Sequence, residues 1–351
     1  MSSRDGRSAA IAIGSGVAVA ILLSAQTQAQ KPRTHRLEAT PETIAYGYYD
    51  AAAKPVLRIA SGDIIDVDTL LTNTPRGLER AGVKPGDIQP SLRAIVDGVK
   101  DKGPGGHILT GPVYVEGAEP GDALEVKILS IDLAITYGYN GCSGFLRENC
   151  RQGTPARLIP LDRKAMTATF APGIVIPLRP FFGSMGVAPP PSAGRISSNP
   201  PWIHAGNLDN KELVAGTTLF IPVHVSGALF EVGDGHAAQG DGEVDQTAIE
   251  TSLRGRLQLT VRKGMTLTWP RAETRTHVIT MGTDEDLVKA TRIAIQEMID
   301  YLAATRNLEK HEAYQLASIA ADVAITQLVD GKVGVHVKLP KSIFVAPRDK
   351  R

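Results

Sequence analysis

The segment GALFEVGDGHAAQGDGEVDQTAIE, from Gly227 to Glu250, is the most informative part of this chain. After an apolar, strand-like start, it gathers acidic, amide and imidazole side chains at Asp234, His236, Gln239, Asp241, Glu243, Asp245 and Glu250. The intervening glycines permit sharp turns and a close approach of the backbone to a ligand: Gly233, Gly235, Gly240 and Gly242. Carboxylates this crowded repel one another unless a cation or deep solvation offsets their charge.

Two interpretations of this segment are open. An imidazole among carboxylates on a glycine-rich turn suits a divalent metal ion or acid/base catalysis. A solvated acidic loop is the plainer alternative, because most charged runs are of that kind. The segment contains no Lys or Arg and follows an apolar strand, which favours the functional interpretation.

Composition limits the possible classes of protein. The 351 residues suffice for one large domain, or for two ordinary ones with a real core. The 38 Lys and Arg nearly balance the 37 Asp and Glu, which argues against a general nucleic-acid role. The 35 glycines, the 23 prolines and the low aromatic content of 5% favour a turn-rich β protein.

The N-terminus has the pattern of a secretory signal peptide. Arg4 and Arg7 precede an apolar run over residues 9–25, and small residues lead to Ala29. We therefore predict a signal peptide over residues 1–29, cleavage after Ala29 and export to the periplasm. An uncleaved membrane anchor is the alternative, although the run is short and interrupted by glycine. No later segment approaches a transmembrane span.

The chain has two cysteines, Cys142 and Cys150. In an oxidising compartment, this short spacing predicts a disulfide. A pair of free thiols is the alternative. A zinc site is less favoured, because the spacing is not CxxC and the intervening loop has no His.

Alternating apolar residues mark the strands of the body. VYVEG (113–117) and ALEVKILSI (123–131) alternate around the turn Glu119–Asp122, which predicts an antiparallel hairpin. His107 stands just before this pair in a glycine-rich loop, as a candidate ligand or proton carrier or as a solvent-exposed side chain. A long Pro/Gly-rich stretch ends in the polar cluster 204–209, which could reach the same cavity as the acidic segment.

Residues 276–340 predict a strand-helix-helix-strand unit. Thr283 is the expected cap of an amphipathic helix, and a second helix is expected over Leu308–Leu328. VGVHVKLP (333–340) alternates as the final strand. The predicted organisation is a β-rich body over residues 30–275 and an α+β part over residues 276–351, packed on the same domain.

Four motifs give the chain a resemblance to a known family: GPVYVEGAEPGD, PFFGSMGVAPP, GNLDNKELVAGTTLFIPV and GALFEVGDGHAAQGDGEV. The chain resembles the acetamidase/formamidase family, from about Glu38 to Phe344. The resemblance implies an α+β, β-rich fold with jelly-roll-like and barrel elements. It also implies hydrolysis of short amides to ammonia and a carboxylate, a homo-oligomer and a divalent metal near the acidic motif. Two features depart from the family: AYGYYDAAAKPV stands where many members carry a His-rich motif, and many members are cytoplasmic.

Amide hydrolysis requires an activated water, a polarised carbonyl oxygen and a protonated leaving amine. Residue types and the family motif together suggest a divalent ion, zinc or else calcium, bound by four side chains: Asp209, Asp234, His236 and Glu250. A rival set replaces Asp234 with Asp241.

The remaining candidates would act on the substrate. Glu243 is the candidate general acid/base, because it lies on the same glycine-rich turn without being needed as a ligand, and His107 is the second choice. Asn207 could hydrogen-bond the substrate or orient a ligand. Backbone N–H groups near Gly240 and Gly242 could face a developing oxyanion.

A different class of protein is also compatible with the fold. An exported protein could bind a small ligand without catalysis. The presence of His236, Asp241 and Glu243 favours the enzyme, because a protein that only binds has no need of an acid/base set. Its expected partners are a small amide substrate and further copies of this chain. We expect no binding of nucleic acid and no membrane span in the mature protein.

Overall fold

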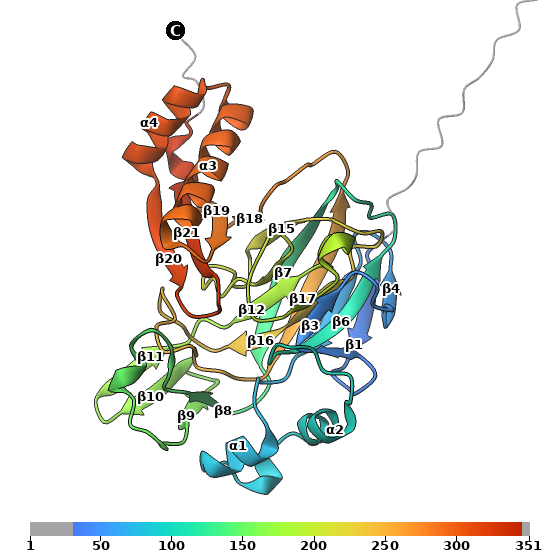
Figure 1. Ribbon diagram of the computed structural model, residues 1–351, viewed down its shortest axis with the longest axis vertical. Coiled ribbons are helices and arrows are strands. Elements are labelled where there is room, and N and C mark those ends of the chain that lie inside the picture. Colours follow the sequence, from blue (N-terminus) through green and yellow to red (C-terminus); the bar gives the residue numbers. More distant parts are fainter. Residues whose placement is uncertain (1–30, 346–351) are drawn as a thin grey trace, which may run out of the picture. The chain divides into compact units, whose positions relative to one another are not determined.

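The computed structural model describes residues 31–345, so the predicted signal peptide, residues 1–29, lies outside the described residues. The largest sheet has nine strands in the order β1-β5-β17-β7-β15-β18-β19-β21-β20 (Figure 1). In that order, the strands are Thr34–Leu37, Ile64–Asp68, Leu253–Arg262, Ala123–Leu133, Thr218–Pro222, Arg271–Glu273, His277–Asp284, Val333–Pro340 and Asp322–Gln327. This sheet contains strands of both the predicted body and the predicted C-terminal part.

A second sheet of six strands carries the acidic segment. Its order is β14-β12-β16-β6-β2, with β4 also paired to β6. The strands are β14 (Ala205–Asn207), β12 (Phe181–Gly186), β16 (Phe230–His236), β6 (Ile108–Val115), β2 (Ile44–Tyr46) and β4 (Leu57–Ile59). One hydrophobic cluster joins this sheet to the large one, with Val113 and Phe230 on one side and Leu124 and Leu257 on the other. The two sheets therefore share a core, as in a β-sandwich.

The predicted hairpin over 113–131 is wrong in its pairing. Both strands exist, but β6 pairs with β16, β2 and β4, whereas β7 pairs with β17 and β15 in the other sheet. The turn between them is a corner that passes from one sheet to the other. Alternation along each segment predicted both strands, but it does not specify which strands they pair with.

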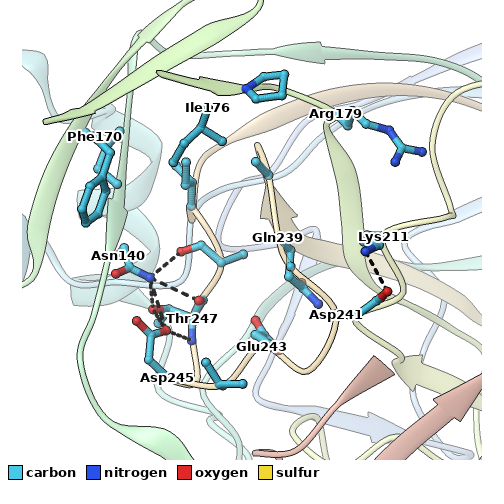
Figure 2. A pocket seen from close by; sticks show the side chains of 17 residues that line it. Asn140, Phe170, Ile176, Arg179, Lys211, Gln239, Asp241, Glu243, Asp245 and Thr247 are labelled. Atoms are coloured by element: carbon cyan, nitrogen blue, oxygen red, sulfur yellow. Dashed lines mark hydrogen bonds and ion pairs between the residues drawn. The ribbon is translucent and has the colours of Figure 1, made fainter. Parts of the chain in front are cut away.

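A smaller sheet of four strands lies beside the acidic segment: β11 (Ile174–Pro177), β10 (Thr167–Ala171), β9 (Arg157–Asp162) and β8 (Tyr137–Asn140). Phe170 and Ile176 of this sheet line one pocket with Gln239 and Thr247 (Figure 2). β3 (Tyr48–Asp50) and β13 (Arg195–Ser197) form a separate two-stranded ribbon. The α+β, β-rich class is confirmed. The described strands form open sheets, so the expected closed barrel element is wrong.

The α-helices of the described chain form two pairs. Two short helices, α1 (Pro75–Arg80) and α2 (Pro90–Gly98), belong to the body. α3 (Leu287–Arg306) and α4 (Lys310–Ala320) share an apolar cluster with β19 and β21. Asp286 rather than Thr283 caps α3, accepting hydrogen bonds from the backbone N–H groups of residues 288 and 289. Among the described residues, no helix is both long and apolar enough to cross a membrane.

The second C-terminal helix is shorter than predicted. It ends at Ala320, and residues 322–327 form β20 at the edge of the large sheet. The β-branched residues Val323, Ile325 and Thr326 favour the extended conformation, and pairing with β21 satisfies their backbone. The unit is therefore strand-helix-helix-strand-strand.

Candidate active site

The buried strand β16 positions the first two site residues. Asp234 and His236 lie two residues apart, so their side chains leave the strand on the same side. His236 Nε2 lies 3.3 Å from Asp234 Oδ2 and 3.3 Å from Glu250 Oε1. β-bridges to His236 and Tyr139 place Glu250, and the backbone N–H of Ala248 donates to Glu250 Oε1 over 2.8 Å.

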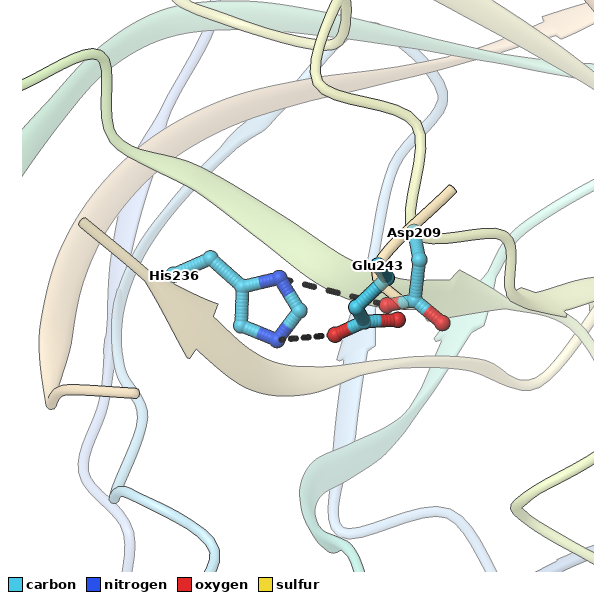
Figure 3. A group of neighbouring side chains, drawn as sticks. All are labelled: Asp209, His236 and Glu243. Carbon is cyan, nitrogen blue, oxygen red and sulfur yellow. Dashed lines mark ion pairs between the residues drawn. The ribbon is translucent and has the colours of Figure 1, made fainter. Parts of the chain in front are cut away.

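Two more carboxylates complete the surroundings of the imidazole (Figure 3). Asp209 Oδ1 lies 3.9 Å from His236 Nδ1, and Glu243 Oε1 lies 4.0 Å from His236 Nε2. Asp209, His236 and Glu243 offer ligand atoms within 4.8 Å of one another, as do Asp234, His236 and Glu250. The four predicted ligands and the predicted general acid/base therefore lie together.

Gln239 fixes the orientation of the imidazole. Its Nε2 donates to the backbone oxygen of Asp209 over 2.7 Å, so its Oε1 is left to accept from His236 Nδ1, 2.9 Å away. The ring edge of Phe181 packs against the imidazole at a centroid distance of 5.1 Å. His236 consequently presents Nε2 toward Asp234, Glu243 and Glu250, while Asp209 lies on the Nδ1 side. Metal-binding histidines present one nitrogen in this way when the other is held by a hydrogen bond.

Burial and crowding perturb the ionisation of these groups. Burial is the largest effect on Asp209 and Glu243, and it raises the pKa of both carboxyls well above their usual range. Burial would raise the pKa of Asp234 as well, but the imidazoles of His107 and His236 lower it instead. Burial alone would lower the pKa of His236, whereas Glu250 and Asp234 raise it well above its usual value.

A bound cation would relieve the strain of this arrangement. Within residues 31–345, both carboxylate oxygens of Asp209 and Oε2 of Glu250 are buried without a hydrogen-bond partner. Unpartnered buried acceptors cost free energy and call for an explanation. One imidazole nitrogen and several carboxylate oxygens form a donor set that suits zinc, and an oxygen-rich set also accommodates calcium. The residues present therefore fit a divalent ion.

The backbone at three of the carboxylates adopts a conformation that side chains rarely take. Asp209, Asp234 and Glu243 have φ angles of 47°, 55° and 40°. Each such residue costs ~1–3 kcal/mol, and strain of this kind gathers at functional sites. The surrounding fold thus holds these side chains in place at the expense of stability.

These residues line a cavity of about 70 Å³. Every predicted site residue except the two glycines contributes to the lining: His107, Asn207, Asp209, Asp234, His236, Glu243 and Glu250. Residues that were not predicted complete it: Thr72, Tyr139, Gln246, Thr247 and Asp330. His107 Nε2 lies 3.8 Å from Asp234 Oδ2, while its Nδ1 is 3.0 Å from Ser198 Oγ. Asn207 is buried, and its Oδ1 has no hydrogen-bond partner.

The structure does not support the roles expected for the two glycines. The N–H of Gly242 already donates to the backbone oxygen of Thr326 over 3.0 Å, so it does not face the cavity. Gly240 is exposed and lies outside the cavity lining. The rival ligand Asp241 points elsewhere as well, because it pairs with Lys211 at 2.7 Å.

Three further residues that shape the site were not predicted from the sequence. Thr72 donates from Oγ1 to Asp234 Oδ1 over 3.2 Å. Asp330, from the turn between β20 and β21, brings a further carboxyl group whose pKa burial raises to about 6. Gly183 leaves room for the site, because a Cβ there would lie 2.5 Å from Asp209 Oδ1 and from Asp234 Oδ2. The PFFGSMG motif was the available signal for Gly183, whereas nothing local marked Thr72 or Asp330.

A disulfide-closed loop braces the segment that carries Glu243. The predicted disulfide between Cys142 and Cys150 is confirmed. Backbone N–H groups of Ser143 and Phe145 donate to the oxygens of Asp245 and Val244 over 3.2 and 2.8 Å. Asn140 Nδ2 lies 2.9–3.3 Å from four acceptors on residues 245–248 (Figure 2).

Removing the disulfide tests this brace. We expect the Cys142→Ser/Cys150→Ser variant to lose about 2–4 kcal/mol of unfolding free energy, because the unfolded chain gains freedom. We also expect kcat to fall about tenfold with a smaller change in KM, because small displacements of a catalytic group are costly. Denaturant unfolding and steady-state kinetics measure the two effects.

The double variant, which has no disulfide, also shows whether a reductant acts on the protein in any other way than by breaking this bond. Reducing the wild-type protein should reproduce both losses, and the same reductant should leave the variant unchanged. An unchanged kcat beside the lost stability would mean that the loop supports the fold without positioning Glu243.

Comparison with known proteins agrees with this geometry. The sequence matches the Acetamidase/Formamidase family over residues 101–197 and 192–346. A formamidase from Methylophilus methylotrophus is 28% identical over 193 residues, which cover 39% of this chain and 47% of that protein. The chain thus spans about half the length of the curated relatives it matches.

Solved structures extend the likeness to most of the chain. A predicted acetamidase/formamidase from Thermoanaerobacter tengcongensis superposes with a TM-score of 0.75 at 28% identity, covering 89% of this chain and 97% of that one. An acetamidase from Bacillus halodurans gives a TM-score of 0.74 at 30% identity, covering 88% and 98%. The family match spans well over half of the sequence, and this chain belongs to the acetamidase/formamidase family.

Proposed function

We propose that this protein is an exported, metal-assisted hydrolase that splits short-chain amides into ammonia and a carboxylate. The observation that carries the proposal is the buried imidazole of His236, surrounded within 4.0 Å by carboxylates of Asp209, Asp234, Glu243 and Glu250 in one small cavity. Membership of the acetamidase/formamidase family supports the reaction class. The similarity to a formamidase and to an acetamidase supports small amides as substrates.

The residues of the cavity have separate roles in the proposed reaction. Asp209, Asp234, His236 and Glu250 would hold a divalent ion, which would supply Lewis acidity to polarise a carbonyl and to lower the pKa of water. The Glu243 carboxylate accepts a proton from the attacking water and returns it to the departing nitrogen.

Two more residues of the cavity handle the substrate. Asn207 Oδ1, buried without a partner, accepts a hydrogen bond from the amide N–H. His107, whose Nε2 lies 3.8 Å from Asp234 Oδ2 and which is half-buried, is the second choice as proton carrier after Glu243.

Export and assembly belong to the same proposal. The sequence pattern of residues 1–29 supports secretion to the periplasm with cleavage after Ala29. Confirmation of the disulfide supports an oxidising compartment, because such bonds persist there. We further propose that the protein works as a homo-oligomer.

Ammonia release tests the proposed reaction. We expect turnover of formamide or acetamide by the metal-loaded protein, loss of turnover on treatment with a chelator, and recovery on adding back zinc or calcium. A metal-loaded protein that binds amides without releasing ammonia would instead be a non-catalytic binding protein. Activity unaffected by complete removal of metal would refute the metal-assisted mechanism.

A further inference from the structure

The four-stranded sheet and the acidic segment line a second pocket, larger than the reaction cavity (Figure 2). It measures about 490 Å³, within the ~300–1,000 Å³ of typical ligand sites, whereas the reaction cavity measures about 70 Å³. Glu243 and Thr247 line both spaces, so the candidate acid/base group stands at their boundary. The reaction cavity has room for little more than the reacting amide group.

The larger pocket has apolar walls. The four-stranded sheet contributes Ile159, Phe170 and Ile176, and the acidic segment contributes Val244 and Ile249. Phe170 remains 37% exposed and Val244 56% exposed. An apolar ligand that covers these side chains gains free energy by removing their surface from water.

The two basic side chains that line the pocket already have acidic partners, and the Asp245 carboxylate there accepts hydrogen bonds from Asn140 and Thr247. Lys211 pairs with Asp241 at 2.7 Å, and the guanidinium of Arg179 lies 3.8 Å from Glu212. A charged ligand would have to break these pairs. The pocket therefore favours a neutral, apolar group.

We propose that this pocket is an acyl-chain subsite, which makes neutral primary amides with chains longer than acetamide the preferred substrates. The proposal rests on the proposed function. The amide nitrogen lies in the reaction cavity beside Asn207, the carbonyl carbon lies at Glu243, and the chain extends along Ile176 and Phe170. A C–O bond to water forms as the C–N bond breaks, and the proton taken by Glu243 leaves on ammonia.

Two neighbouring residues on β11 provide a matched test. Ile176 is half-buried and lines the pocket, whereas Val175 is 59% exposed and does not line it. A tryptophan at position 176 fills the subsite, while one at position 175 points away from it. Both substitutions place the same indole side chain on the same strand.

Substrate chain length is the readout. Burial of each methylene corresponds to up to about fourfold in affinity, so we expect kcat/KM to rise at least ~10-fold from acetamide to hexanamide in the wild-type protein. Ile176→Trp should lower the ratio of hexanamide to acetamide kcat/KM about tenfold, and Val175→Trp should leave that ratio unchanged. No rise with chain length, or equal losses for both substrates in Ile176→Trp, would overturn the subsite.

Calorimetric binding separates this proposal from the proposed reaction. Hexanamide should bind more tightly than acetamide, and Ile176→Trp but not Val175→Trp should remove the difference. If no amide is hydrolysed but this binding pattern holds, hydrolysis fails and the subsite stands. Equal binding of both amides overturns the subsite whether or not ammonia is released.

Discussion

Replacing Glu243 with Gln should lower kcat for acetamide by about 10²- to 10⁴-fold, the usual contribution of a positioned acid/base group. The amide is isosteric with the carboxyl but can neither accept a proton from water nor deliver one to the leaving nitrogen. Because Glu243 is buried and its pKa is raised, the uncharged replacement should leave thermal stability equal or higher. Steady-state kinetics and thermal unfolding test both expectations.

The control for this substitution is an exposed carboxylate outside the site. Glu285→Gln, just before α3, should retain wild-type kinetics. Retention of kcat within tenfold by Glu243→Gln, with bound metal intact, would remove Glu243 from the acid/base role. Asp330 would then be the next group to test, since it faces the same cavity.

Adding one methyl group at Gly183 should damage the site while leaving the fold intact. A Cβ at this position would lie 2.5 Å from two carboxylate oxygens and 2.8 Å from His236 Cε1, closer than real contacts allow. These atoms end flexible side chains, so Asp209, Asp234 and His236 must move. Misplacement of about 1 Å costs roughly 10²-fold in rate, and we expect Gly183→Ala to lose at least that much kcat/KM.

The same substitution should weaken divalent metal binding, because it displaces proposed ligands. Isothermal titration with zinc measures this effect independently of turnover, and circular dichroism checks the fold. Gly86→Ala is the matched control, since Gly86 is exposed, lines neither pocket, and its Cβ would meet no described atom within 4 Å. Normal metal affinity and activity in Gly183→Ala would contradict the assignment of these side chains as ligands.

Glu243→Gln and Gly183→Ala both test a site whose arrangement lowers the stability of the fold. The fold buries several carboxylates around an imidazole, leaves some of their oxygens without partners and places three of them at left-handed backbone angles. Each of these features lowers stability. Their coincidence in one cavity is explained most simply by a ligand that supplies the missing positive charge.

Part of the site could be predicted from local sequence. Asp234 and His236 share a strand face because they are two residues apart, and the glycine-rich turn that follows returns Glu243 and Glu250 to the same place. Asp209 was found only through the polar cluster and the family motif. The roles of Gly240 and Gly242 were not predictable, because the partner of the Gly242 N–H comes from the far end of the chain.

The sequence by itself determined most of the strands, the α+β class, the disulfide pair and the group of ionisable residues on one turn, because each depends on residues close together in the chain. Only the tertiary structure decided that β6 and β7 belong to different sheets, that Asp330 and Thr72 reach the cavity and that Gly183 leaves space for it. Strand partners and cavity walls are set by which buried surfaces pack together over long separations. Alternation and spacing along the sequence do not predict those long-range contacts.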